Sequence, residues 1–118
     1  MRTIDLLDDG VRIGFSGIDH ALTLVREAFV PYVLIESVEV GASDVPGPWT
    51  LWRIGLAEPI TDRRRGRFWR DGKRWLLDLR DPDRAVVIRL RPGGQYDAVA
   101  IQSHDPERLA DDIRGRLA

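Results

Sequence analysis

Residue types that could carry out hydrolysis occur together near the end of the chain. Ser103, His104 and Asp105 are consecutive and supply the three residue types of a hydrolase triad. Consecutive residues of a strand point to opposite faces, so these side chains are not expected to converge on one point. Asp105 also precedes Pro106, a pairing that favours a helix N-cap. We therefore interpret this triplet as structural.

A second polar group, Ser16, Asp19 and His20, lies within one short loop sequence. The segment from Gly14 to Ile18 lacks the final glycine of a nucleophile elbow, so Ser16 is not expected to be a nucleophile. Only two histidines are present, without the paired spacing of a metal site, and the common phosphate-binding glycine motifs are missing. We expect no catalytic residue, no metal and no cofactor, and therefore no enzyme.

A basic cluster is the strongest candidate for a binding site. Residues 63 to 74 contain seven basic residues and one acidic residue, a local excess of seven minus one, or +6. Two tryptophans interleave with the basic residues and would suit stacking or insertion at an interface. The candidate residues are Arg63, Arg64, Arg65, Arg67, Trp69, Arg70, Lys73, Arg74 and Trp75. An acidic protein segment, a nucleic-acid backbone or anionic lipid headgroups would suit them. The alternative is a solvated hairpin whose charges discourage edge pairing.

The four tryptophans, Trp49, Trp52, Trp69 and Trp75, carry more aromatic bulk than a small barrel interior readily holds. Some of them are therefore expected on the surface, where tryptophan is enriched at binding hot spots. Symmetric self-association is the simplest use of such a surface. A core that contains all four is the alternative.

Composition excludes several other functions. The chain has 118 residues, 43% of them hydrophobic and 31% charged, which fits a single globular domain over residues 1–118. Eighteen basic and nineteen acidic residues give a net charge of -1, so nucleic acid is not an expected partner. The absence of cysteine excludes a disulfide scaffold, an iron–sulfur cluster and a thiol nucleophile. With no long apolar run and no signal peptide at the charged start, we expect a cytoplasmic protein.

The spacing of apolar residues predicts a chain made largely of strands. Asp71-Gly72 between two apolar runs is typical of a two-residue hairpin, and further turn sequences follow at 81–84 and 92–94. We predict a four-stranded antiparallel meander from Gly66 to Gln102. Earlier alternating runs lie near residues 3–7, 11–15 and 35–40, whereas Trp49 to Leu56 fits a strand, a loop or a short helix. Six to seven strands in up-and-down order are expected over about 3–102.

One amphipathic helix is predicted over about 106–117. Leu109, Ile113 and Leu117 recur every four residues and form an apolar stripe. An antiparallel sheet of this size must close or leave long edges exposed, and such a helix can cover its open mouth. We therefore predict an antiparallel β-barrel capped by a C-terminal helix.

Several short segments resemble the bacterial pleckstrin-homology-like (PH-like) domains. These segments are Phe29-Val30-Pro31-Tyr32, residues 35–40 (IESVEV), Gly66-Arg67-Phe68, residues 80–88 and Asp105-Pro106-Glu107. The resemblance implies a bent seven-stranded antiparallel barrel with a capping helix. It also implies a scaffold for binding or oligomerisation, with no reaction attached to the fold.

The function that we expect is a non-enzymatic interaction module that self-associates or binds a protein partner. The alternatives are a barrel that binds a lipid or small ligand, and binding of an anionic surface such as a membrane through Arg63–Arg74. In the lipid-binding branch that the chain resembles, basic residues around the loop between the first two strands hold phosphoinositides. Here that loop is Asp8-Asp9-Gly10 or Ser16–His20, and neither contains a lysine or arginine. We therefore expect no phosphoinositide binding by the usual loop.

Overall fold

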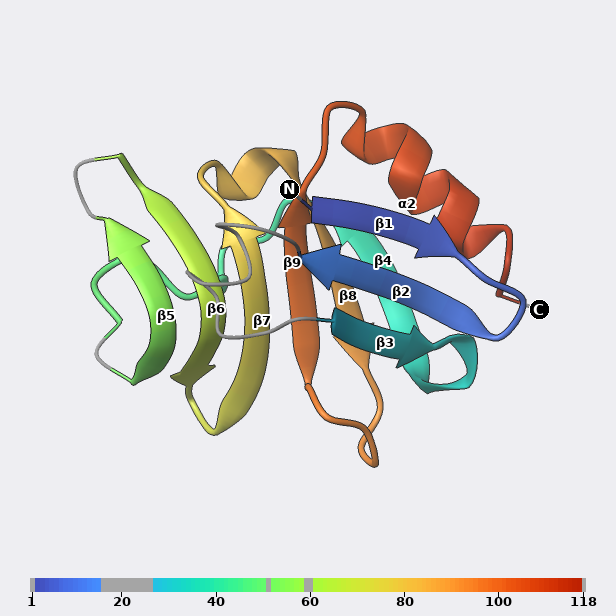
Figure 1. Cartoon of the computed structure of the whole chain (residues 1–118), viewed down its shortest axis with the longest axis horizontal. Helices are drawn as coiled ribbons and strands as arrows, with labels where there is room; N and C mark the ends of the chain where they lie inside the picture. The colour runs from blue at the N-terminus through green and yellow to red at the C-terminus, as the bar shows by residue number, and fades with distance from the viewer. Residues whose placement is uncertain (1, 16–26, 51, 59–60, 118) are drawn as a thin grey trace.

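The computed structural model describes residues 2–15, 27–50, 52–58 and 61–117 and is mainly β, with a C-terminal helix, as predicted (Figure 1). A small sheet contains β1 (Arg2–Leu6), β2 (Gly10–Phe15) and β3 (Glu27–Pro31). A large sheet contains β4 (Ile35–Val40), β5 (Arg53–Glu58), β6 (Arg63–Arg70), β7 (Lys73–Leu79), β8 (Ala85–Leu90) and β9 (Ala98–Gln102). Short 3-10 helices, η1 (Tyr32–Leu34) and η2 (Pro82–Arg84), precede β4 and β8, and α2 (Pro106–Arg114) ends the fold. The described residues therefore form nine strands, more than the six to seven predicted.

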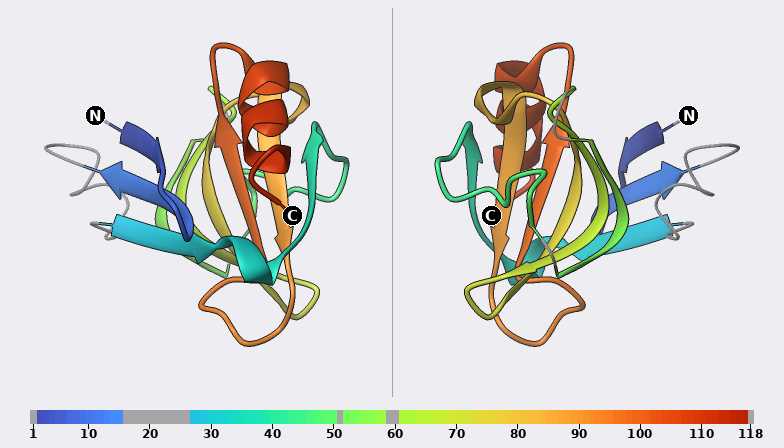
Figure 2. Two further views of the ribbon diagram at one scale, coloured as in Figure 1. Left: turned by 90° about the vertical axis from the view of Figure 1, so that its right-hand side faces the viewer. Right: turned by 90° about the vertical axis from the view of Figure 1, so that its left-hand side faces the viewer.

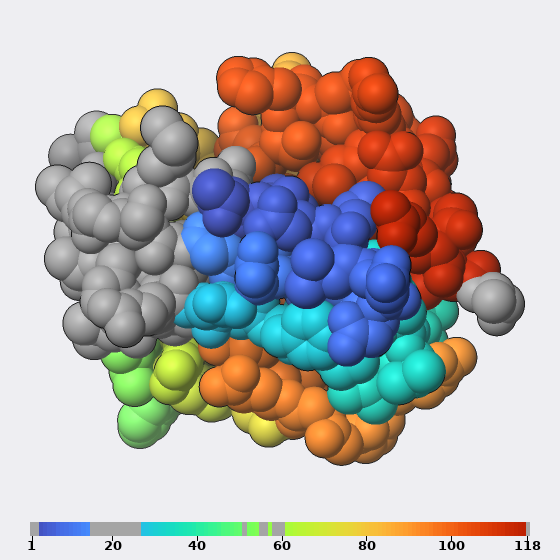
Figure 3. Space-filling view, turned by 45° about the vertical axis from the view of Figure 1, so that its right-hand side comes forward, coloured from blue at the N-terminus to red at the C-terminus, as the bar shows by residue number. Residues whose placement is uncertain are grey.

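The small sheet is an antiparallel meander in the order β1-β2-β3. Val11 and Ile13 of β2 alternate inward and are buried, as their period-2 spacing predicts, and Ala28 and Val30 of β3 are buried in the same way. The strands of this sheet cross those of the large sheet at a steep angle (Figures 1 and 2). In the space-filling view the residues of β1 to β3 form one continuous surface bordered by the C-terminal helix (Figure 3).

The large sheet has the strand order β4-β8-β9-β7-β6-β5, so the predicted up-and-down meander is wrong. The β6–β7 hairpin is confirmed, and its turn residues Asp71 and Gly72 have φ angles of 53° and 75°. However, β9 lies between β7 and β8 and pairs with β7 in parallel. The physical reason is burial: Ala98 to Ile101 are all buried, and a strand that is apolar on both faces needs a central position.

The segment that the sequence left open, Trp49 to Leu56, contains the start of strand β5 at Arg53. The backbone N–H of Trp69 donates to the carbonyl of Trp52 at 2.9 Å and extends the contact between β5 and β6 beyond the ladder. Because β5 is the last strand in the order, it forms one edge of the large sheet.

Two apolar cores cover the two faces of the large sheet. The first contains Ile13 and Val30 of the small sheet, Ile88 and Val99 of the large sheet, and Ile113 of α2. The second core lies on the opposite face and groups these residues: Val45, Phe68, Trp75, Leu77, Leu79, Ala85, Val87, Ala98 and Ala100. The connection between β4 and β5 covers this second face through Val45.

Helix α2 packs against β4 and β8 and begins as predicted, with the Asp105 carboxylate accepting a hydrogen bond from Arg108 N at 3.2 Å. It ends at Arg114, because Gly115 lowers helix propensity, so the predicted end near residue 117 is one turn too late. The guanidinium of Arg114 donates to the carbonyl of Val38 at 2.6 and 3.1 Å and ties the helix to β4.

The hydrogen-bond ladders of the described residues form two separate sheets, and no closed barrel is seen among them. The predicted capped barrel is therefore confirmed only as a mainly β fold with one C-terminal helix. Within the described ranges, no helix is long and apolar enough to cross a bilayer.

Candidate functional site

The predicted basic cluster is divided between the two faces of β6. Arg64, Gly66 and Phe68 are buried on one face, whereas Arg63, Arg65, Arg67 and Trp69 alternate on the other. The cluster therefore does not form one continuous basic patch.

Arg64 is only 2% exposed, and its guanidinium is occupied within the protein. It donates to the Asp62 carboxylate at 2.6 Å and to the carbonyls of Pro46 and Arg80, each at 3.2 Å. These bonds tie the β4–β5 connection and the end of β7 to β6. Arg64 therefore links these segments through its guanidinium.

Other members of the cluster lie at the far end of β6. Arg74 bonds to the Asp97 carboxylate through Nε at 3.2 Å and Nη2 at 3.3 Å, and this ion pair lowers the pKa of Asp97. Arg70 and Lys73 are exposed beside the β6–β7 turn. Trp75 is buried in the second core, and the guanidinium of Arg89 lies 5.7 Å from the centre of its ring.

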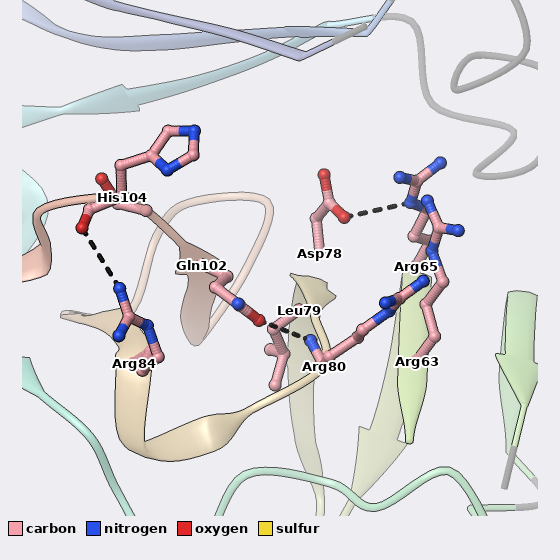
Figure 4. Close-up of a pocket in the computed structure, with 9 residues that line it drawn as sticks. Arg63, Arg65, Asp78, Leu79, Arg80, Arg84, Gln102 and His104 are labelled. Carbon is pink, nitrogen blue, oxygen red and sulfur yellow. Dashed lines mark hydrogen bonds and ion pairs between the residues drawn. The ribbon is translucent and has the colours of Figure 1, made fainter. Parts of the chain in front are cut away.

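The first basic residues of β6 line an open pocket of about 310 Å³, which we call the arginine pocket (Figure 4). It lies where β6 begins and where β7 and β9 end. Its lining residues are Arg63, Arg65, Asp78, Leu79, Arg80, Arg84, Gln102, Ser103 and His104. Figure 4 shows Arg63 and Arg65 on one side of the pocket and Arg84 with His104 on the other. Sequence analysis missed Arg80 and Arg84, which are distant along the chain and brought close by strand pairing.

Hydrogen bonds to Gln102 and Asp81 fix the backbone between the two arginines that the sequence analysis missed. The side-chain oxygen of Gln102 accepts from the N–H of Arg80 at 2.8 Å and from that of Asp81 at 3.0 Å. The Asp81 carboxylate in turn accepts from Asp83 N at 2.9 Å and caps η2. Arg80, which precedes the cap, and Arg84, the last residue of η2, are thereby held in place.

The arginine pocket carries a strong positive charge. Four arginines and one aspartate line it, which gives four minus one, or +3, with His104 neutral. Among the described residues that line the pocket, Asp78 is the acidic one, and it forms an ion pair with Arg65 at 3.1 Å. Arg84 donates to the backbone carbonyl of His104 at 3.2 Å and forms no ion pair with another described residue. Within the described part of the chain, the side chains of Arg63 and Arg80 form no ion pair.

Ser103, His104 and Asp105 are not arranged as a triad. Ser103 and His104 line the arginine pocket, whereas the Asp105 carboxylate caps α2. Ser16, Asp19 and His20 lie outside the described residues. Among the residues that are described, no group of three or more histidine and acidic side chains is arranged to hold a metal ion.

A second surface feature lies at the opposite end of β6. Trp52 is 78% exposed, Trp69 is 36% exposed and Ile54 is also exposed, and both tryptophans line a shallow pocket beside the β6–β7 turn. We call Trp52, Ile54 and Trp69 the aromatic patch. Trp49 is exposed as well, so Trp75 alone of the four tryptophans lies in the core, and the surface interpretation is confirmed for the other three.

Searches of protein-family models, curated proteins and solved structures found no match to this chain. The resemblance to PH-like domains therefore stays a prediction.

Proposed function

We propose that this chain is a PH-like, non-enzymatic binding module that holds a phosphoryl group of an anionic ligand in the arginine pocket. The observation that carries this proposal is the pair Arg63 and Arg80, which line the same open pocket and whose guanidinium groups have no ion-pair partner among the described residues. Arg84 adds a third guanidinium that has no ion pair within the described part of the chain. Guanidinium groups form charge-assisted and often bidentate hydrogen bonds to phosphate oxygens, which gives both affinity and orientation.

This site differs from the usual phosphoinositide site of the family that the chain resembles. The turn between β1 and β2 exposes Asp8 and Asp9, which repel phosphate. We therefore place the ligand at the ends of β7 and β9, and we propose no phosphoinositide binding through the β1–β2 turn.

Titration with inorganic pyrophosphate at low ionic strength tests the arginine pocket. The variant Arg63→Gln/Arg80→Gln is expected to bind at least about tenfold more weakly, because each charge-assisted hydrogen bond contributes roughly 1.5–3 kcal/mol. The control Arg70→Gln/Lys73→Gln removes the same two charges outside the pocket and is expected to change affinity less than twofold. Equal weakening by both variants would show nonspecific attraction and refute the site.

Vesicles containing phosphatidylglycerol separate the two sources of a phosphoryl group. Sedimentation with vesicles that pyrophosphate reverses would indicate a lipid headgroup. Binding of pyrophosphate without sedimentation would indicate a soluble phosphorylated compound. Added salt is expected to weaken either interaction, since the pocket is open to solvent.

A second candidate function, self-association or binding of a protein partner, is favoured by the aromatic patch. Exposed tryptophans beside the edge strand of the large sheet provide hot-spot side chains. Light scattering over a concentration series tests self-association, with Trp52→Ser/Trp69→Ser as the variant. We expect a mass above that of the monomer for the native chain, and a monomer for the variant.

A further inference from the structure

The four strands beside the arginine pocket place three of its cations and one hydroxyl in a single row. Continued beyond the last paired residues, the register of β6 with β7 brings Arg63 opposite Arg80. The registers of β9 with β7 and with β8 bring Ser103 between Arg80 and Arg84. All four of these residues line the pocket.

The spacing along this row divides the cations into two groups. Neighbouring strands lie about 4.8 Å apart, so the backbones of Arg63 and Arg80 are separated by one strand spacing and those of Arg80 and Arg84 by two, or roughly 10 Å. Figure 4 shows Arg84 across the pocket from Arg63, and the hydrogen bond to the carbonyl of His104 holds it there. Arg63 and Arg80 are therefore placed to share one phosphoryl group, and Arg84 is placed to hold a second.

The charge and the size of the pocket indicate the same kind of ligand. Four arginines and one aspartate give four minus one, or +3, whereas a phosphomonoester supplies only about -1.5 to -2 at pH 7. A second, linked phosphoryl group adds the missing negative charge. The volume of about 310 Å³ corresponds to about ten water molecules in the liquid, at roughly 30 Å³ each, which is close to the number of non-hydrogen atoms in pyrophosphate.

We propose that the arginine pocket holds a diphosphate group, with one phosphoryl group on Arg63 and Arg80 and the other on Arg84. Ser103 lies between the two positions, where its hydroxyl can donate to a phosphoryl oxygen. Free pyrophosphate and an ester of pyrophosphate both contain this group. The inference rests on the function proposed above and assigns the chemical class of its ligand.

Calorimetric titration at constant ionic strength compares pyrophosphate with methyl phosphate, which carries one phosphoryl group. We expect pyrophosphate to bind at least about tenfold more tightly, because it gains the charge-assisted hydrogen bonds of Arg84. Arg84→Gln is expected to reduce this preference for pyrophosphate about tenfold. Arg84→Lys keeps the charge and loses the fork of donors, so its preference should lie between those of Arg84→Gln and the native chain. The control Arg70→Gln removes one charge outside the pocket and is expected to keep the native preference.

Two further ligands complete the test. Citrate is a trianion without phosphoryl groups, and we expect it to bind more weakly than pyrophosphate. Methyl diphosphate distinguishes the two sources of the group: binding as tight as that of pyrophosphate supports an esterified diphosphate, and weaker binding supports free pyrophosphate.

The diphosphate inference and the proposed function fail in different ways. If methyl phosphate or citrate binds as tightly as pyrophosphate, or if Arg84→Gln keeps the native preference, the diphosphate inference is overturned. Binding of methyl phosphate that still depends on Arg63 and Arg80 would then leave the proposed function standing. If neither pyrophosphate nor methyl phosphate binds, both proposals are refuted.

Discussion

Replacing Arg64 by methionine tests whether the basic cluster contains a residue that stabilises the fold. Methionine keeps much of the aliphatic volume and removes the guanidinium. The variant loses hydrogen bonds to the buried segment at Pro46 and to the carbonyl of Arg80, both at 3.2 Å. The bond to Asp62 contributes less, because the Asp62 side chain is 54% exposed.

The expected magnitude follows from these contacts. Each hydrogen bond from a charged donor contributes about 1.5–3 kcal/mol to stability. The methionine variant avoids the cost of burying a guanidinium, which offsets part of this loss. We therefore expect Arg64→Met to lower the free energy of unfolding by about 2–4 kcal/mol. For a domain of this size, this corresponds to a fall in Tm of roughly 10 °C.

Urea and thermal unfolding followed by circular dichroism measure this change. Arg70→Met is the control, since Arg70 is exposed and its nearest carboxylate, that of Asp71, lies 3.8 Å away. The control is expected to change stability by less than about 0.5 kcal/mol. A loss below about 1 kcal/mol in Arg64→Met would refute the structural role of this residue.

Three further predictions concern the fold. Asp105→Ala removes the cap of α2 and is expected to cost about 1 kcal/mol in urea unfolding, while Asp105→Asn keeps most of that stability. Hydrogen bonding from Arg74 lowers the pKa of Asp97 in the folded state, so its contribution is present above the unfolded pKa of about 3.9. The stability difference between the native chain and Asp97→Asn should therefore shrink as the pH falls below about 4, and a constant difference would contradict this. Gly72→Ala is expected to cost roughly 1–2 kcal/mol, because φ at this turn is +75°; an unchanged urea midpoint would contradict that.

Local signals in the sequence predicted the local structure well. Asp71-Gly72 specified the β6–β7 hairpin, and Asp105 specified the start of α2, because each depends on backbone geometry within a few residues. The position of β9 depends on burial of both its faces, which turn residues do not encode. The sequence signal for a central strand is the uninterrupted apolar run from Ala98 to Ile101, whose four residues are all buried in the structure.

The sequence predicted only the part of the candidate site that lies within one local run of basic residues. Arg63 and Arg65 belong to the basic run, and the alternation of a strand separates them from Arg64. Arg80 and Arg84 join them because β6 pairs with β7 and η2 follows β7 directly. This meeting depends on the register between strands, so charge density along the chain does not reveal it. Two arginines on either side of an Asp-Pro turn were the available signal.

The central place of β9 has a consequence for synthesis of the chain on the ribosome. Without β9, the pair β4–β8 and the three strands β5, β6 and β7 share no backbone ladder. Until residues 98–102 emerge and pair with β8 and β7, each of these two groups of strands has an edge without its partner strand. When β7 and β8 have emerged and residues 98–102 are still inside the ribosome, both edges are open to aggregation, and the arginine pocket, one wall of which is the end of β9, is incomplete.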